Sequence, residues 1–249
     1  MLFLGYDSHI IFKSLNKVKL NKEPTVIAKG MEKFISLNVE ELAFKDSLQF
    51  LNSSLEKLVE NLADKAIKSE GKLTLEQVFP NLDKYFQENW WHLPNPKKAF
   101  SMLTRKGVYP YSYMDSFGQL FTHIHNTLFH FRYNLDKFEE ANLPDRKEFT
   151  NDLSKKEISD EDFNFIHDLY NTFNLQNLGE LHDLYMDTDV LLLADVIEGF
   201  RAWSMSVYML DPAHFTTSPG LSWSACLRTT KQKLEIPTDP KMHLFFDRG

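Results

Sequence analysis

The residues best suited to chemistry lie in the stretch LHDLYMDTDVLLLADVIEGF, from Leu181 to Phe200. Read at helical spacing, one face of this stretch carries Tyr185, Asp189, Leu192, Leu193, Val196 and Phe200. A carboxylate on the buried side of a helix is costly unless it is paired, hydrogen-bonded or bound to a cation. In nucleases that hydrolyse a phosphodiester with two divalent ions, such an aspartate holds a metal, and a tyrosine one turn earlier helps to orient the attacking water. Taken alone, the spacing favours a simpler interpretation: a carboxylate near the helix N-terminus and a surface tyrosine.

The elements that must position these residues follow from local signals. Short β-rich segments at 25–28, 34–39 and 42–48 predict three strands of one sheet. Helix starts are predicted at Ser54, at the capping box that Thr74 forms with Gln77, at Asn95-Pro96 and at Ser159. Helices outnumber strands, so the expected fold class is α/β and helix-rich.

Composition limits the kind of protein and the kind of metal site. The chain has 249 residues, 43% of them apolar, which is ample for a packed core. Cys226 is the single cysteine, so any metal ligands should be hard oxygens, which suit Mg²⁺ or Mn²⁺. No apolar run reaches the roughly 20 residues of a membrane span, and the first residues lack the pattern of a signal peptide. We expect a soluble intracellular protein with no membrane partner.

Four segments carry a resemblance that spans nearly the whole chain. They are GYDSH at 5–9, RKGVYPYSYMDSF at 105–117, LHDLYMDTDVLLLAD at 181–195 and LDPAHFTTSPGLSW at 210–223. Together they resemble protein-primed family B DNA polymerases, the type encoded by viruses, linear plasmids and virus-like transposons. The resemblance implies a ribonuclease-H-like 3'-5' exonuclease domain at residues 1–210, enlarged by helices, and a connector toward a polymerase palm at residues 211–249.

The resemblance also assigns roles to individual residues. Tyr185 and Asp189 match the third exonuclease motif of the family, and Asp7 matches the aspartate of the second. It implies that Asp7 and Asp189 hold Mg²⁺ or Mn²⁺, that the partner is the single-stranded 3' end of DNA, and that a terminal protein can take part in the intact system.

A tyrosine-rich loop follows Gly107. In the resembled family this loop lies near the path of single-stranded DNA, and unpaired bases can stack on tyrosine rings. Tyr109, Tyr111 and Tyr113 are therefore candidate DNA-binding residues, with structural packing as the alternative.

The chain departs from the family pattern in several places. Leu2 stands where the family has asparagine, and the first exonuclease motif, Asp-x-Glu, would lie before Met1. YMDTD also looks like a palm motif, but helical periodicity continues through Gly199, whereas the palm motif lies in a hairpin. Residues 118–135 interrupt the resemblance, and we interpret them as a possible unspliced intron. The ending at Gly249 looks like truncation.

Two functions are compatible with these observations. The first is a fragment of a DNA-directed DNA polymerase, with remnants of the proofreading site and no activity alone. The second is a domesticated, non-catalytic helical binding module of transposon origin. An autonomous exonuclease would need the missing glutamate of the first motif.

Overall fold

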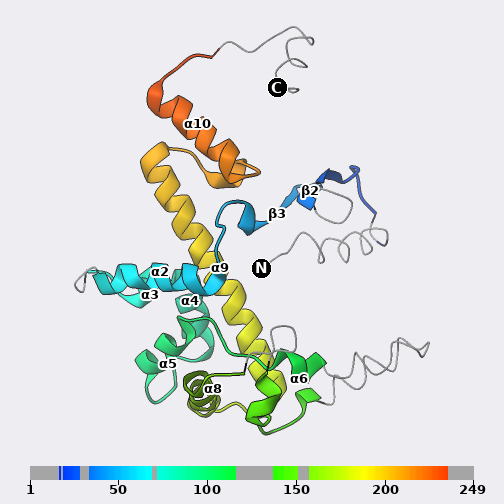
Figure 1. Ribbon diagram of the computed structural model, residues 1–249, viewed down its shortest axis with the longest axis vertical. Helices are drawn as coiled ribbons and strands as arrows, with labels where there is room; N and C mark the ends of the chain where they lie inside the picture. The colour runs from blue at the N-terminus through cyan, green and yellow to red at the C-terminus, as the bar shows by residue number, and fades with distance from the viewer. Residues whose placement is uncertain are drawn as a thin grey trace. The chain divides into compact units, whose positions relative to one another are not determined.

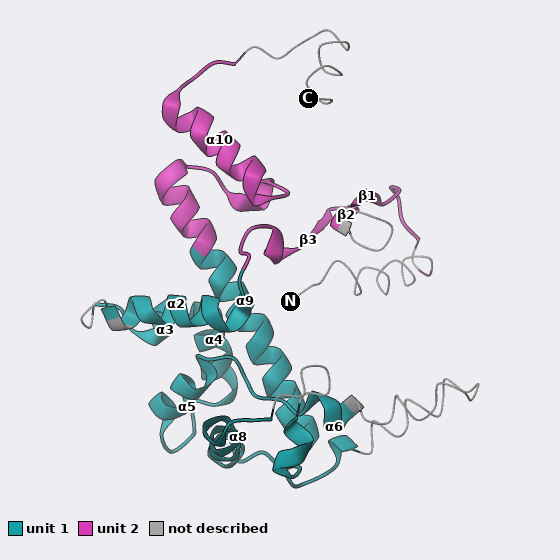
Figure 2. Ribbon diagram, in the orientation of Figure 1, with its two compact units in different colours: residues 1, 53–199 teal, residues 2–52, 200–249 magenta. Residues whose placement is uncertain are grey.

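The computed structural model describes residues 17, 19–28, 34–68, 72–115, 137–150 and 157–234. The chain divides into two compact units, residues 1 and 53–199 and residues 2–52 and 200–249, shown in two colours in Figure 2. The motif around Asp7 and the insertion at 118–135 lie outside the described residues, so the expectations for them stay predictions. The same holds for the last part of the connector, from residue 235 onward.

The second unit contains a three-stranded antiparallel sheet in the order β1-β2-β3. Its strands are β1 (Thr25–Ala28), β2 (Phe34–Val39) and β3 (Leu42–Lys45). Val26 faces Leu37 in the first pair, and Leu37 faces Phe44 in the second. Two of the strands match the prediction, but the third ends earlier than the expected Leu48. There Asp46 accepts a hydrogen bond from the Leu48 N–H and begins a short 3-10 helix, η1 (Ser47–Gln49).

The first unit is built from helices. They are α2 (Leu55–Lys68), α3 (Leu75–Val78), α4 (Pro80–Asn89), α5 (Pro96–Leu103), α6 (Tyr111–Asp115), the 3-10 helix η2 (Arg146–Phe149), α8 (Asp160–Thr172) and the greater part of α9 (Leu178–Tyr208), the long yellow helix in Figure 1. The predicted caps are confirmed. Gln77 accepts from the Thr74 N–H at 3.1 Å, Asn95 from Lys98 at 3.2 Å, and Ser159 from Asp162 at 3.0 Å.

The core of the first unit lies where these helices meet. Its most deeply buried side chains are Phe79, Leu82, Phe86, Leu103, Ile166, Phe173, Leu178, Leu181, Leu184 and Leu192. Phe86 and Phe100 meet edge to face, with ring centroids 5.4 Å apart. Aromatic and aliphatic burial of this kind is the main source of favourable folding free energy.

Helix α9 is 31 residues long and confirms that the stretch from Leu181 to Phe200 is helical. The helix extends past this stretch at both ends. Asn177 caps its start by accepting from the Glu180 N–H at 2.9 Å. It ends before Met209, whose positive φ of 54° places it in the left-handed region.

The second unit continues with η3 (Pro212–His214) and α10 (Ser218–Thr230). Helix α10 has Pro219 in its first turn, where proline fits a helix. Within the described ranges, no helix combines the length and apolar character that crossing a membrane requires. The fold is therefore helix-rich with a small antiparallel sheet, in agreement with the expected α/β class.

Candidate functional site

Tyr185 lies on α9 with only 7% of its surface exposed, and the chain after α5 packs against it. The ring of Tyr109 stacks on the ring of Tyr185, with centroids 5.0 Å apart and planes inclined by 21°. The Tyr111 hydroxyl forms a hydrogen bond with the Tyr185 hydroxyl. The structure thus brings two of the three candidate DNA-binding tyrosines to the candidate catalytic tyrosine.

Tyr113 is held by a different set of contacts. Its hydroxyl donates to Glu140 at 2.5 Å, and the Lys137 ammonium lies 3.8 Å from its ring centroid. The hydrogen bond to the Glu140 carboxylate, together with burial, raises the pKa of Tyr113 to about 12. Contacts to Lys137 and Glu140 account for the position of Tyr113, as the packing alternative expects.

Gly107 makes the closest approach to Tyr185. A Cβ atom placed on Gly107 would lie 2.7 Å from Cδ2 of the Tyr185 ring. Real Cβ contacts are essentially never this short, so any other residue at 107 would displace the ring. Only glycine lets the backbone pass this close to the phenol.

Tyr109 also contacts a histidine on α9. Its hydroxyl lies 2.8 Å from Nδ1 of His182, and the two rings are 5.4 Å apart. The other side of this cluster is closed by Phe138, whose ring centroid lies 5.0 Å from that of His182. Tyr109 is therefore engaged by α9 through both its ring and its hydroxyl.

Burial of the phenol raises the pKa of Tyr185 above that of an ordinary tyrosine, and the hydrogen bond with Tyr111 adds to the effect. The Tyr185 hydroxyl therefore stays protonated at neutral pH. It can donate or accept a hydrogen bond, but it does not act as a base.

Asp189, one turn after Tyr185, is half-buried. Its Oδ1 atom is fully buried and has no hydrogen-bond partner among the residues that the structure describes. Burial raises the pKa of the Asp189 carboxyl, and the nearby Lys106 ammonium opposes this shift. An unsatisfied buried carboxylate oxygen is unusual in folded proteins and calls for an explanation.

Asp195, by contrast, is buried and fully engaged. With 2% exposure, it accepts hydrogen bonds at Oδ1 from the backbone N–H and the side-chain amide of Asn81, at 2.9 and 2.7 Å. Its Oδ2 accepts from the Leu82 N–H at 3.1 Å. Asn81 and Leu82 stand in the first turn of α4, so a carboxylate from α9 caps that helix from outside.

Asp195 was not predicted from the sequence, because the predicted buried face of α9 is rotated slightly about the helix axis from the observed one. Between residues 181 and 196 of α9, the buried side chains are Leu181, Leu184, Tyr185, Thr188, Leu192, Asp195 and Val196. Asp195 lies three residues after Leu192 and seven after Thr188, so helical spacing alone could have identified it.

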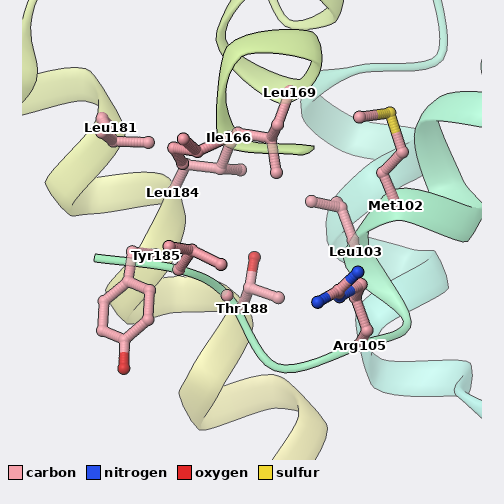
Figure 3. Close-up of a pocket in the computed structure, with 11 residues that line it drawn as sticks. Met102, Leu103, Arg105, Ile166, Leu169, Leu181, Leu184, Tyr185 and Thr188 are labelled. Carbon is pink, nitrogen blue, oxygen red and sulfur yellow. The ribbon is translucent and has the colours of Figure 1, made fainter. Parts of the chain in front are cut away.

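A cavity of about 20 Å³ lies beside this face and is lined mainly by apolar side chains. Figure 3 shows Thr188 on the side of Leu103 and Arg105, while the Tyr185 ring is directed away from Met102 and Leu103. The Thr188 hydroxyl is buried and has no hydrogen-bond partner in the described part of the chain. The cavity is therefore not formed around the Tyr185 hydroxyl.

Of the two expected metal ligands, Asp189 lies in the described residues. Within residues 17, 19–28, 34–68, 72–115, 137–150 and 157–234, no three histidine, cysteine, aspartate or glutamate side chains gather closely enough to hold a metal ion. Asp7, the second expected ligand, lies outside these ranges.

Comparisons with known proteins give no further assignment. No protein-family model, curated protein or solved structure matches this chain.

Proposed function

We propose that the chain is part of a protein-primed family B DNA polymerase and comes from its proofreading exonuclease region, with a ribonuclease-H-like core. The observation that carries the proposal is on α9: the buried Oδ1 of Asp189 lacks a partner among the described residues, one turn after Tyr185. A cation ligand is one of the few roles that accounts for a carboxylate in this state.

The chemistry of the proposed ligands suits a hard divalent cation. Asp189 offers a carboxylate oxygen, the donor type that Mg²⁺ and Mn²⁺ prefer, and Asp7 is the second proposed ligand. When bound, such an ion supplies Lewis-acid activation of water and of the phosphate. The chain itself contributes a protonated phenol, Tyr185, which orients the water by hydrogen bonding.

Single-stranded DNA is the proposed partner, and Tyr111 is the best placed of the three tyrosines to contact it. Tyr111 has 52% of its surface exposed, while Tyr109 stacks on Tyr185 and Tyr113 contacts Lys137 and Glu140. Stacking of an unpaired base on a tyrosine is worth roughly 1–3 kcal/mol and tolerates any sequence.

The isolated polypeptide is proposed to be inactive. Two-metal hydrolysis uses about four carboxylates around two ions, and Asp7 and Asp189 are the only ones assigned to the site. They would hold one ion weakly. The chain also carries no polymerase palm motif, so it is proposed neither to proofread nor to polymerise.

Thermal unfolding with and without Mn²⁺ tests the assignment of Asp189. Ligand binding at ten times the dissociation constant stabilises a protein by about 1.4 kcal/mol, so Mn²⁺ should raise the Tm of the wild type. Asp189→Asn should abolish that rise. Asp187→Asn, which changes an exposed acid two residues earlier, should keep it. Without metal, Asp189→Asn should be more stable than the wild type, since the amide replaces a carboxylate that burial destabilises.

Two outcomes contradict the proposal in different ways. A wild-type Tm that does not respond to Mn²⁺ removes Asp189 as a ligand. Robust Mn²⁺-dependent cleavage of single-stranded DNA that Asp189→Ala abolishes would show that the chain is an active nuclease alone.

A domesticated binding module is a second candidate, supported by apolar side chains exposed in the second unit. Trp203 and Val207 near the end of α9 are 47% and 53% exposed, and Trp223 on α10 is 58% exposed. Exposed apolar surface of this kind often marks a protein contact. The flanking genome separates the two candidates, since a polymerase origin requires Asp-x-Glu upstream and palm motifs downstream.

A further inference from the structure

The segment from Gly107 to Tyr111 contacts Tyr185 at three places. Its glycine passes beside the ring edge, its first tyrosine stacks on the ring face, and its second tyrosine meets the hydroxyl. Each contact restricts a different motion of the phenol. The stacked ring fixes the plane of Tyr185, and the close backbone limits the side-chain rotamer. The hydrogen bond with the Tyr111 hydroxyl, in which either hydroxyl can be the donor, restrains the position of the Tyr185 hydroxyl oxygen.

We infer that the segment Gly107–Tyr111 is a positioning element for the Tyr185 phenol. The segment lies more than 70 residues before Tyr185 in the sequence, so the position of the Tyr185 hydroxyl is set by the tertiary fold and not by α9 alone. Tyr111 acts through Tyr185 and is a positioning residue. The functional meaning of this role rests on the proposed function, in which Tyr185 orients water.

Gly107 provides the space that the arrangement requires. The φ angle of Gly107 lies outside the left-handed region, so the importance of this glycine lies in its missing Cβ. Gly199, on the same helix as Tyr185, is a matched comparison. A Cβ there would meet Cδ1 of Leu62 at 3.5 Å, an ordinary van der Waals contact.

The test observes the Tyr185 phenol directly and needs neither metal nor DNA. The full chain is labelled with tyrosine carrying ¹³C at Cζ, which gives a resonance for each of its nine tyrosines, and Tyr185→Phe identifies the one from Tyr185. Tyr111→Phe removes the hydroxyl partner. Tyr109→Phe is the matched control, because it keeps the stacked ring and removes a hydroxyl that meets His182.

The expected result is a shift of the Tyr185 resonance in Tyr111→Phe that exceeds any shift in Tyr109→Phe. Gly107→Ala should also move this resonance, and Gly199→Ala should leave it in place. Circular dichroism confirms that each variant is folded. Tyr111 is half-exposed, so Tyr111→Phe decides the question even if Gly107→Ala does not fold.

A Tyr185 resonance that stays in place in Tyr111→Phe overturns the inference, as does an equal shift in Tyr109→Phe. Failure of the Mn²⁺ experiment on Asp189 would leave this result unaffected, so the two proposals can fail separately.

Discussion

Replacing Asp195 should destabilise the first unit more than any other single change of an acidic residue on α9. Its carboxylate receives three N–H groups from the first turn of α4, two of them from the backbone. Losing a helix cap costs about 1–2 kcal/mol. A hydrogen bond to a charged group is worth about 1.5–3 kcal/mol, and the favourable effect of a carboxylate at a helix N-terminus adds to it.

These contributions are not additive, and removing the carboxylate also relieves the cost of burying it. We therefore expect Asp195→Ala to lower the free energy of unfolding by about 3 kcal/mol, a large fraction of the 5–15 kcal/mol typical of a domain. Asp195→Asn keeps one oxygen for Asn81 but turns an amide NH₂ toward the Leu82 N–H. It should cost about 1.5 kcal/mol.

Urea unfolding followed by far-UV circular dichroism at pH 7 measures both changes. The urea concentration at the unfolding midpoint should fall, while the slope of the free energy of unfolding against urea concentration stays the same, because the surface exposed on unfolding is unchanged. Asp183→Ala is the control, since Asp183 is an exposed acid on the same helix, and it should change stability by less than about 0.5 kcal/mol. Equal stability of Asp195→Ala and Asp183→Ala would refute the conclusion that the Asp195 carboxylate caps α4.

Two further predictions concern other polar groups. Thr188→Val replaces a buried hydroxyl, which has no hydrogen-bond partner in the described ranges, with a methyl group of similar shape. This substitution should raise the free energy of unfolding by about 1 kcal/mol. A lower free energy of unfolding in the same urea experiment would mean that the hydroxyl is hydrogen-bonded. The hydrogen bonds that Arg201 donates at 3.0 and 2.7 Å lower the pKa of Asp211 to about 2. Because its folded pKa lies below the unfolded one, the Asp211 carboxylate stabilises the protein above pH ~4, and this contribution disappears as the pH falls toward ~2. The pair is partly exposed, so Asp211→Asn should cost about 1 kcal/mol at pH 7 and only a small fraction of that near pH 2. A difference that does not change with pH would contradict the assignment.

Helix starts could be predicted because their signals are local. The caps at Thr74, Asn95 and Ser159 each involve residues three apart in the sequence, so the pattern and the hydrogen bond are visible together. The predicted end of the third strand was wrong, and the cause is again a local hydrogen bond. Asp46 prefers to bond its own backbone two residues on, and this local bond ended the strand before Leu48.

The types of residue in the candidate site could be predicted from the sequence, but the contacts between them could not. Nothing local pairs Asp195 with Asn81, because the two residues lie 114 positions apart. Likewise, the tyrosine-rich loop was recognised, but its sequence could not distinguish Tyr111, which meets the Tyr185 hydroxyl, from Tyr113, which meets Glu140. Asp7 lies outside the described residues, so its pairing with Asp189 stays a prediction.

The cap that Asp195 of α9 provides for α4 limits how α9 can change during evolution. Asp195 follows Tyr185 by ten residues, about 15 Å along a helix axis, and both side chains meet fixed partners in the first unit. Inserting or deleting one residue between them would rotate one partner by about 100° relative to the other. Between these two positions, substitutions are therefore easier to accommodate than insertions or deletions. The ten-residue interval fixes the spacing of the two contacts that α9 makes with the surrounding helices.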